Sequence, residues 1–394
     1  MKKEMKTITI GLVGAGFAGN FHLNAYSHVT GVNVRCKWVM DVDAARARAL
    51  ADKWGCDNAT ANLDDMLNDP EVEAIDIVTT PSTHTDIALK ALRAGKHVVC
   101  EKPLTGYFGK PGDPEPIGKM VPKAKMYEAL IRECEELKAA VEQSGKLFMY
   151  AENYVYTPSI VRAAEMIRAK KSKIMYMKGE ESIRCSTSPM SPHWKYSGGG
   201  SSVRLGVHPL TGMLWLKQVD AEARGEKVKP VSVTADMGRI SDSLADKDKR
   251  YFPQSPNDVE DFSTMVVTFS DGTKAVCMAN DNTLGGVKNY VEIFTTDSAL
   301  TCNITPSDNL MTYFLDHDGI EDVFISEMLK EKTGWNAAYV RDDIMRGYTP
   351  ECSEFAHCIA ENRPSMAGFD LAYDTIKIVY AAYISAEEGR RVDL

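Results

Sequence analysis

Two short stretches of the chain combine residue types at spacings that suit chemistry. In the first, GAGFAG, the residues Gly14, Gly16 and Gly19 follow a β-rich run directly and open a helical pattern. Glycines at this spacing permit a tight turn, a close approach of the backbone to a pyrophosphate, and close packing of the helix on the strand. A helix N-terminus also favours phosphate charge, so the pattern predicts a dinucleotide site.

The second stretch, HVVCEKP, puts Lys102 at the end of a short apolar run, immediately before Pro103. Parallel sheets bind ligands just outside the carboxyl ends of their strands, so a lysine at such an end can meet a substrate. Pro103 would fix the direction of the turn. A surface lysine in front of a loop is the alternative, and the strand-end position alone leaves both interpretations open.

An acidic residue completes the dinucleotide pattern. The run NVRCKWVM ends just before Asp41, at the distance from the glycines expected for a carboxylate that binds the ribose hydroxyls. A carboxylate there repels a 2′-phosphate, and no arginine follows it immediately. We therefore expect NAD rather than NADP as the cofactor.

The elements that must position these residues alternate along the first half of the chain. Strand-like runs cover residues 7–13, 33–40, 73–80 and 96–100, and helical patterns cover residues 17–29, 43–55 and 83–95. This alternation predicts a parallel, doubly wound sheet. In the second half, alternating runs turn at Asp271-Gly272 and at Asp297-Ser298, which indicates antiparallel strands. The polar stretch 241–261 predicts a long loop.

Length and composition set bounds on the fold and on the partners. A chain of 394 residues is suited to two domains. Its net charge of −9 argues against a nucleic-acid partner and against a basic membrane-surface protein. No apolar run is long enough to span a bilayer. The nine cysteines are scattered without CxxC spacing, which indicates reduced thiols in a cytoplasmic protein.

Five segments together resemble the Gfo/Idh/MocA family, which includes glucose–fructose oxidoreductases, inositol dehydrogenases and many sugar dehydrogenases. The segments are GLVGAGFAG, DVDAARARALADKWG, TTPSTHTDIALKALRAGKHVVCEKPL, GGGSSVRLGVHPLTGMLWL and the closing EFAHCIAENRPSMAGFDLAYDTIKIVYAAYISAEEGRRVDL. The resemblance covers nearly the whole chain, and GKHVVCEKP is its most specific part.

The resemblance implies an α/β protein with an N-terminal NAD-binding Rossmann domain over residues 1–150 and a C-terminal α+β domain over residues 151–394. The second domain would carry a large, open, mostly antiparallel sheet, and the C-terminal helices would pack back towards the Rossmann domain. Such a sheet needs covering, which favours a homo-oligomer: a dimer, a tetramer or a larger assembly.

A Pro- and Gly-rich insert over about residues 105–125 departs from the family, whose members usually run from Glu-Lys-Pro fairly directly into a helix. Its composition argues against a helix or a central strand. Because the insert starts beside Lys102, we expect it at the rim of the substrate pocket or at an oligomer contact.

The resemblance also implies the cofactor site. NAD would be bound by the glycine-rich turn, by the carboxylate after the second strand, and by residues at the ends of the later strands. The residues concerned are Gly14, Gly16, Phe17, Ala18, Gly19, Asp41, Thr80, Pro81, His84, Glu101 and Lys102.

In the resembled family the lysine of Glu-Lys-Pro sits beside the nicotinamide and the reacting sugar carbon, and the Lys-Pro bond is often cis. Lys102 would orient the substrate hydroxyl and stabilise negative charge on its oxygen, while a neutral His208 accepts the proton; the reverse assignment stays open. Arg204 stands where an aspartate is common, so the aspartate's role is not carried over. Arg204 either contacts substrate oxygens or forms an ion pair, for which Glu152 and Glu180 are candidate partners.

Four further residues are weaker candidates for substrate binding: His193, Trp194, Tyr154 and Tyr156. A loop His-Trp pair can bind a sugar by hydrogen bonding and stacking, but these residues are as often structural, and strand tyrosines are more often packing residues. No group of acidic or histidine residues has convincing metal spacing, so we expect no metal.

These features predict an NAD-dependent oxidoreductase that acts on a secondary hydroxyl of a sugar, cyclic polyol or glycoside. Oxidation at position 3 of a glucoside is one form of this reaction. An NAD-dependent glycosidase, which oxidises transiently so that the aglycone leaves by elimination, is the enzymatic alternative. A non-catalytic NAD-binding sensor on the same fold is the other, although it would not need Lys102 and His208.

Overall fold

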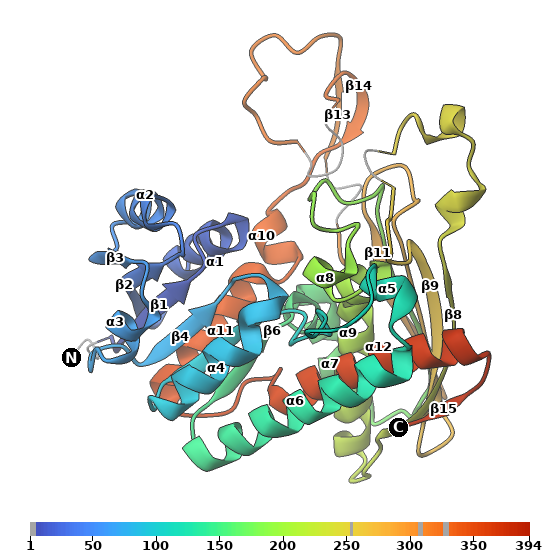
Figure 1. The fold of residues 1–394 in the computed structure, drawn as a ribbon, viewed down its shortest axis with the longest axis horizontal. Helices are drawn as coiled ribbons and strands as arrows, with labels where there is room; N and C mark the ends of the chain where they lie inside the picture. Colours follow the sequence, from blue (N-terminus) through green and yellow to red (C-terminus); the bar gives the residue numbers. More distant parts are fainter. Residues whose placement is uncertain (1–4, 253–254, 306–309, 326–330) are drawn as a thin grey trace. The chain divides into compact units, whose positions relative to one another are not determined.

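The structure is a computed structural model that describes residues 5–252, 255–305, 310–325 and 331–394. The chain folds into two compact units, each of which combines segments that are far apart in the sequence (Figure 1). Unit 1 contains residues 1–107, 128–156 and 347–376, and unit 2 contains residues 108–127, 157–346 and 377–394.

Unit 1 is built on a six-stranded sheet in which every pair of neighbouring strands is parallel. The strand order is β3-β2-β1-β4-β5-β6. The strands are β1 (Thr7–Val13), β2 (Asn33–Met40), β3 (Asn58–Thr60), β4 (Ala74–Ile77), β5 (His97–Glu101) and β6 (Phe148–Ala151). Most are buried along their length, as expected for a parallel sheet that helices cover. The predicted doubly wound parallel sheet is confirmed.

Unit 1 also contains helices, and those over residues 17–27, 44–54 and 84–93 lie at the predicted places. They are α1 (Phe17–Ser27), α2 (Ala44–Trp54), α3 (Leu63–Leu67), η1 (Pro81–Thr83), α4 (His84–Arg93), η2 (Asn153–Tyr156) and α11 (Tyr348–Glu361). The Asp43 side chain caps α2 by accepting a hydrogen bond from the backbone N–H of Ala45 at 3.0 Å, and Gly55 ends α2 in the left-handed conformation. The short elements β3 and α3 were not predicted, because so few residues carry little periodicity.

Unit 2 is built on a seven-stranded sheet in the order β12-β11-β7-β10-β9-β8-β15. The strands are β7 (Ile174–Ser182), β8 (Pro230–Gly238), β9 (Phe262–Phe269), β10 (Lys274–Asn280), β11 (Lys288–Thr295), β12 (Ala299–Asn303) and β15 (Val392–Asp393). β7 and β10 are parallel, and the other neighbours are antiparallel. The predicted mostly antiparallel sheet is confirmed. A separate hairpin pairs β13 (Met311–Phe314) with β14 (Gly334–Ala337).

The helices of unit 2 include one that is buried on nearly all sides. They are α5 (Ile117–Met120), α7 (Pro158–Lys170), α8 (Trp194–Ser197), η3 (Ser202–Gly206), α9 (Val207–Ala223) and α10 (Asp342–Met345). α9 packs against α7 and β7, and its apolar residues are spread around most of its circumference, as expected for a buried helix. Two longer helices, α6 (Lys123–Ser144) and α12 (Phe369–Glu388), contribute residues to both units.

The segment predicted as a loop, 241–261, contains two short 3₁₀ turns, η4 (Ile240–Ser243) and η5 (Asp246–Lys249). Residues 253–254 of this segment lie outside the described residues. The segment has no longer element among its described residues, so the loop prediction is confirmed in its main feature.

The Pro- and Gly-rich insert packs within unit 2. The helical turn α5 interrupts it, although its composition argued against any helix. The backbone N–H of Gly118 donates to Asp258 Oδ2 at 2.9 Å, and a Cβ at Gly118 would collide with the Asp258 carbonyl oxygen. Lys123 Nζ donates to the Gly118 carbonyl at 2.6 Å and lies 5.0 Å from the Trp194 ring centroid. The predicted division at residue 150 assigns this segment to the first domain, whereas its contacts group it with unit 2.

Candidate active site

The glycine-rich turn between β1 and α1 has the geometry that its sequence predicts. Gly14 has φ +115°, and a Cβ there would lie 2.7 Å from the Val78 carbonyl oxygen. A Cβ at Gly19 would collide with the Gly14 carbonyl oxygen, so helix and strand pack as closely as the pattern requires. Gly16 is the N-cap of α1 and brings no side chain, which lets the first N–H groups of the helix face a phosphate.

Asp41 follows β2 and is tied to this turn by backbone hydrogen bonds. Its Oδ2 accepts from the Ala15 N–H at 2.9 Å, and its Oδ1 accepts from the Asp43 N–H at 3.0 Å. The parallel topology puts the carboxyl end of β2 beside that of β1, so the carboxylate lies where a ribose would meet it. Arg46, which the sequence argument did not single out, places Nη2 3.6 Å from Asp41 Oδ2.

The turn after β4 is linked to the turn after β5 by His84. Thr80 precedes the helical turn η1, and Pro81 opens it. The His84 ring is buried, with Nδ1 2.9 Å from the Pro103 carbonyl oxygen and Nε2 3.2 Å from the Thr79 carbonyl oxygen. Burial lowers the pKa of His84, which favours the neutral ring. His84 therefore fixes the backbone that carries Lys102 and Pro103.

Lys102 stands at the carboxyl end of β5, and its backbone is held by the residue before it. Glu101 Oε2 accepts a hydrogen bond from the Lys102 N–H at 2.9 Å. The Lys102-Pro103 peptide bond is cis, as the resemblance implied. Because β1, β2, β4 and β5 run parallel, the glycine turn, Asp41, Thr80 and Lys102 lie at one edge of the sheet in unit 1.

The sequence analysis did not predict a buried polar group next to Glu101, the residue before Lys102. His22 of α1 places Nδ1 2.9 Å from Asp76 Oδ2 of β4 and Nε2 3.2 Å from Glu101 Oε1. His22 is 2% exposed and Asp76 is fully buried. An aspartate in the middle of the apolar run EAIDIV was the available signal, because a buried carboxylate needs a partner.

In unit 2, helical structure begins at Ser202, as predicted, with a π-helical turn before α9. The Glu260 carboxylate fixes this start by accepting from the N–H of Gly200 at 3.0 Å and from the Ser202 hydroxyl at 2.6 Å. The Tyr383 hydroxyl donates to the same carboxylate at 2.9 Å. His208 is the second residue of α9 and is 6% exposed.

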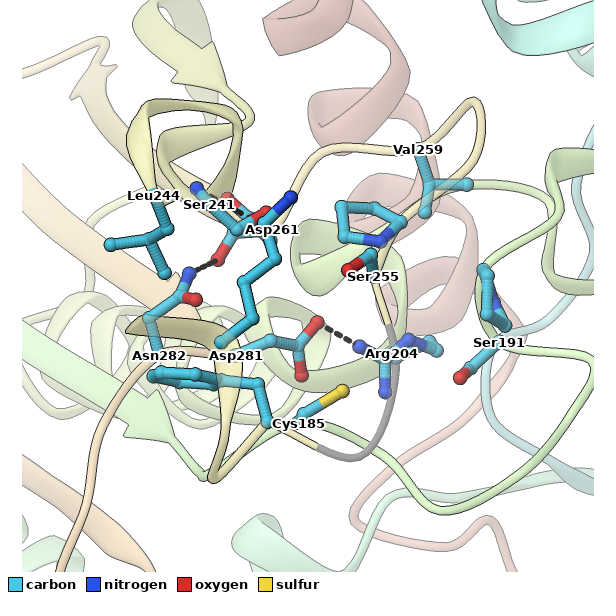
Figure 2. A pocket seen from close by; sticks show the side chains of 14 residues that line it. Cys185, Ser191, Arg204, Ser241, Leu244, Ser255, Val259, Asp261, Asp281 and Asn282 are labelled. Carbon is cyan, nitrogen blue, oxygen red and sulfur yellow. Dashed lines mark hydrogen bonds and ion pairs between the residues drawn. The ribbon is translucent and has the colours of Figure 1, made fainter. Parts of the chain in front are cut away.

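Arg204 forms an ion pair with Asp281, which follows β10 (Figure 2). The Asp281 carboxylate raises the pKa of Arg204, outweighing the burial that lowers it. The sequence suggested Glu152 and Glu180 as partners of Arg204, whereas the ion pair described here is with Asp281. The pair borders a cavity of about 20 Å³, which also has Cys185, Ser191 and Asp261 in its lining. This volume suits ordered water rather than a sugar ring.

The other substrate candidates have mainly packing contacts. Trp194 is 1% exposed and lies 4.8 Å, centroid to centroid, from Tyr383. Tyr154 and Tyr156 are buried in unit 1, and the Tyr156 hydroxyl accepts from the Ala367 N–H at 3.1 Å. His193 is partly exposed and places Nδ1 3.1 Å from Asn257 Nδ2.

The described residues contain neither a cluster of metal ligands nor a membrane-spanning helix. Within residues 5–252, 255–305, 310–325 and 331–394, no group of three or more His, Cys, Asp or Glu side chains is arranged to hold a metal ion. In the same part of the chain, no helix is long and apolar enough to cross a membrane.

Sequence comparison matches both parts of the chain to one family. A model described as the oxidoreductase family with an NAD-binding Rossmann fold (Gfo/Idh/MocA) matches residues 8–125, and a model of the Gfo/Idh/MocA C-terminal domain matches residues 181–301. Together the two matches cover more than half of the chain.

Individual relatives are named sugar and inositol dehydrogenases. Levoglucosan dehydrogenase of Pseudarthrobacter phenanthrenivorans is 25% identical over 328 residues, which cover 79% of this chain and 77% of that protein. Inositol 2-dehydrogenase of Salmonella typhimurium is 40% identical over 100 residues, which cover 25% of this chain and 29% of that protein.

Solved structures share the fold along nearly the whole chain. GenD2 from gentamicin A biosynthesis, in complex with NAD, has a TM-score of 0.77 at 23% identity and covers 100% of this chain and 98% of its own. Levoglucosan dehydrogenase in complex with NADH and levoglucosan has a TM-score of 0.72 at 21% identity and covers 99% of both chains.

Proposed function

The chain belongs to the Gfo/Idh/MocA family of NAD-binding oxidoreductases, and we propose that it oxidises a secondary hydroxyl of a sugar, cyclic polyol or glycoside. The observation that carries this proposal is the shared edge of the unit 1 sheet. That edge combines a dinucleotide turn with the lysine of the Glu-Lys-Pro motif. A dehydrogenase needs both, because hydride and proton leave neighbouring atoms of the substrate.

The residues at this edge fit NAD. The Gly14 turn and the first N–H groups of α1 would hold the pyrophosphate, and Asp41 would accept hydrogen bonds from the ribose hydroxyls. Phe17 and Ala18 follow Gly16 in the first turn of α1, and Thr80 and Pro81, after β4, would flank the cofactor. Bound NAD supplies the acceptor for the hydride that leaves the substrate carbon.

We propose that Lys102 and His208 together remove the proton from the substrate hydroxyl. The Lys102 ammonium orients the substrate hydroxyl and stabilises negative charge as it develops on the oxygen. A ring nitrogen of neutral His208 takes the hydroxyl proton. The opposite assignment, with Lys102 as base, uses the same two residues and is separated from this one by the pH dependence of the two variants.

The substrate class follows from the relatives and from one departure from the family. Two relatives are named for levoglucosan and inositol, which are both cyclic and carry secondary hydroxyls. Arg204 replaces the common aspartate, and its described partner is Asp281. We therefore expect substrate hydroxyls to be bound by a different set of residues, among which His193 is a partly exposed candidate.

The outer face of the unit 2 sheet supports a homo-oligomer. Tyr176 of β7 is 40% exposed, and its ring stacks on Phe294 of β11 at a centroid distance of 4.5 Å. Aromatic side chains of this kind on an open sheet are suited to burial against a second copy. Light scattering of the purified chain, compared with a Tyr176→Lys variant, tests this assembly.

A substrate panel tests the proposed function. The panel contains free hexoses, inositols, glucosides and 1,6-anhydro sugars, each incubated with the protein and NAD while reduced-nicotinamide absorbance is followed. At least one cyclic substrate should give a rate that Lys102→Ala abolishes. Release of an aglycone without net NADH would identify a glycosidase, and NAD binding without turnover of any substrate would favour a sensor.

A further inference from the structure

We propose that His22 is a buried imidazolium that positions Lys102 through the side chain of Glu101. This inference rests on the proposed role of Lys102 and adds a residue that neither the motif nor the family match assigns. His22 touches neither proposed reacting group directly by any described contact, so its role is positioning rather than catalysis.

The contacts form a chain that starts on α1 and ends on the Lys102 backbone. His22 Nδ1 lies 2.9 Å from Asp76 Oδ2, and His22 Nε2 lies 3.2 Å from Glu101 Oε1. The second oxygen of Glu101, Oε2, accepts from the Lys102 N–H at 2.9 Å. The Glu101 carboxylate is therefore held at both oxygens, one by the ring and one by the residue that it positions.

The ring must carry a proton on each nitrogen to satisfy both carboxylates. A neutral imidazole has one N–H donor and one acceptor, so it would turn a lone pair towards either Asp76 or Glu101. That arrangement would leave one carboxylate facing a lone pair instead of a donor, which is most costly for Asp76 at 0% exposure. The imidazolium donates to both carboxylates and removes the conflict.

The electrostatics of the surroundings agree with this state. Burial alone lowers the pKa of His22, but the Asp76 and Glu101 carboxylates outweigh it and raise the pKa well above its usual value. On α11, burial raises the pKa of Glu351 well above its usual value, which favours its neutral form.

Further groups from the neighbouring elements complete this surrounding. They are Tyr26 on α1 itself, Cys352 on α11, Tyr150 on β6 and Glu152 just after β6. Burial raises the pKa of Tyr26, Cys352 and Tyr150, so these three groups stay neutral. None of these groups is a cation, so His22 carries the positive charge among the groups named here.

The imidazolium should affect both the position of Lys102 and the pKa values of the groups around it. Without the imidazolium, Glu101 loses the donor at Oε1, which weakens its hold on the Lys102 N–H and loosens the turn after β5. A misplacement of about 1 Å at a reacting group costs up to about a hundredfold in rate. A positive charge near Lys102 also favours proton loss from neighbouring groups, so its removal should be visible in the pH dependence.

The test uses the full chain and three variants. His22→Gln keeps a polar side chain but removes the charge, Asp76→Asn removes one of the two carboxylates, and His28→Gln is the control. His28 follows the same helix, is exposed, and makes its ring contact with the Asn24 carbonyl at 2.8 Å. Turnover on the substrate found in the panel, NAD affinity and melting temperature are measured for each across pH 6–10.

We expect His22→Gln to lower kcat between about tenfold and a hundredfold, with NAD affinity within about twofold of the wild type. On the alkaline side of the pH profile, kcat of this variant should change at a higher pH than in the wild type. The reason is that loss of a positive charge raises the pKa of a nearby base. His28→Gln should match the wild type in all three measurements. Unchanged turnover in His22→Gln, or a loss of turnover without this shift on the alkaline side, would overturn the proposal.

Nitrogen NMR of histidine-labelled wild-type protein reads the charge without any activity measurement. Both ring nitrogens of His22 should carry protons at pH 7.5, whereas in Asp76→Asn the ring should become neutral at a lower pH. A neutral His22 ring in the wild type would defeat the proposal even if every variant failed to fold. Conversely, full turnover in Lys102→Ala would remove the proposed role of Lys102 while leaving the charge of His22 as measured.

Discussion

At the scale of single residues, we propose that Asp41 sets the preference for NAD over NADP. Its carboxylate is fixed by the N–H groups of Ala15 and Asp43, so it cannot turn away from a 2′-phosphate at low cost. Arg46 lies 3.6 Å away and, at 55% side-chain exposure, can move towards added negative charge.

We therefore expect the wild type to bind NAD better than NADP. In Asp41→Ser the difference in affinity between the two cofactors should become smaller, because Arg46 is released from Asp41 and can pair with a 2′-phosphate. Titration calorimetry with both cofactors measures this, and the double variant Asp41→Ser with Arg46→Ala separates the two contributions. Equal binding of both cofactors by the unmodified protein would contradict the assignment of Asp41.

Lys102 and His208 carry the second residue-scale prediction. Replacing either by alanine should lower turnover by at least about a hundredfold, which is the usual effect of removing a positioned acid or base. NAD affinity should change little in His208→Ala, and the fold should persist in both, as circular dichroism would report. Near-normal turnover in both variants would make these residues structural and would favour a sensor.

Arg204 gives a prediction about stability. Arg204→Ala leaves the Asp281 carboxylate buried without this partner, and breaking a buried pair typically costs about 3 kcal/mol of folding free energy. The double variant Arg204→Met with Asp281→Leu should recover most of that loss, because it removes both charges. The exposed pair of Arg162 and Glu165 is the control, and Arg162→Ala should change the melting temperature little. A raised Michaelis constant without a lowered melting temperature would instead identify Arg204 as a substrate contact.

At the scale of elements, Gly118 makes a close contact between the insert and the rest of unit 2. A Cβ at position 118 would collide with the backbone carbonyl of Asp258, whose side chain also accepts from the Trp194 N–H at 2.8 Å. Gly118→Ala should therefore cost about 1–3 kcal/mol, as overpacked sites do. Gly238→Ala is the matched control, since a Cβ there would meet nothing within 4 Å. Calorimetric melting of both variants checks this, and equal melting temperatures would show that the insert is not held at this point.

The order of the elements explains why the candidate cofactor residues and Lys102 share one edge of the sheet. In a parallel sheet, the turns after β1, β2, β4 and β5 all leave from the same edge, so a glycine turn and a lysine far apart in sequence are neighbours. The segment that starts α9 is different, because a buried carboxylate rather than a strand end fixes it. Glu260 holds Gly200 and Ser202, and burial raises its pKa.

At the scale of the whole molecule, buried groups with raised pKa values make stability depend on pH. Glu351 has an ordinary pKa of 4.5 and His22 one of 6.5, and both are raised well above these values in the fold. The folded protein therefore binds more protons than the unfolded chain above these values, and the free energy of unfolding falls as pH rises. We expect the melting temperature to fall steadily from pH 6 to pH 9.

Calorimetry of the wild type and of His22→Gln across this range measures the contribution of the histidine. The variant should be less stable at pH 6 and should lose less stability on going to pH 9. A melting temperature that rises over the same range would show that other groups dominate.

The sequence by itself determined the family, the two sheets and the cofactor turn, because each depends on local patterns. Glycine spacing fixes the turn at Gly14, the alternation of apolar runs fixes the strands, and a proline fixes the direction after Lys102. These signals act within about ten residues of the chain, where residue type limits the backbone directly.

Only the tertiary structure decided which buried charges meet. His22 contacts Asp76 and Glu101, which are 54 and 79 positions away, and Arg204 pairs with an aspartate 77 positions away. A sequence shows that a buried charge needs a partner but not which one, because the partner is chosen by how distant elements pack. For this protein that choice brought Asp76 and Glu101 to the two ring nitrogens of His22, and we propose that the ring donates a hydrogen bond to each of them.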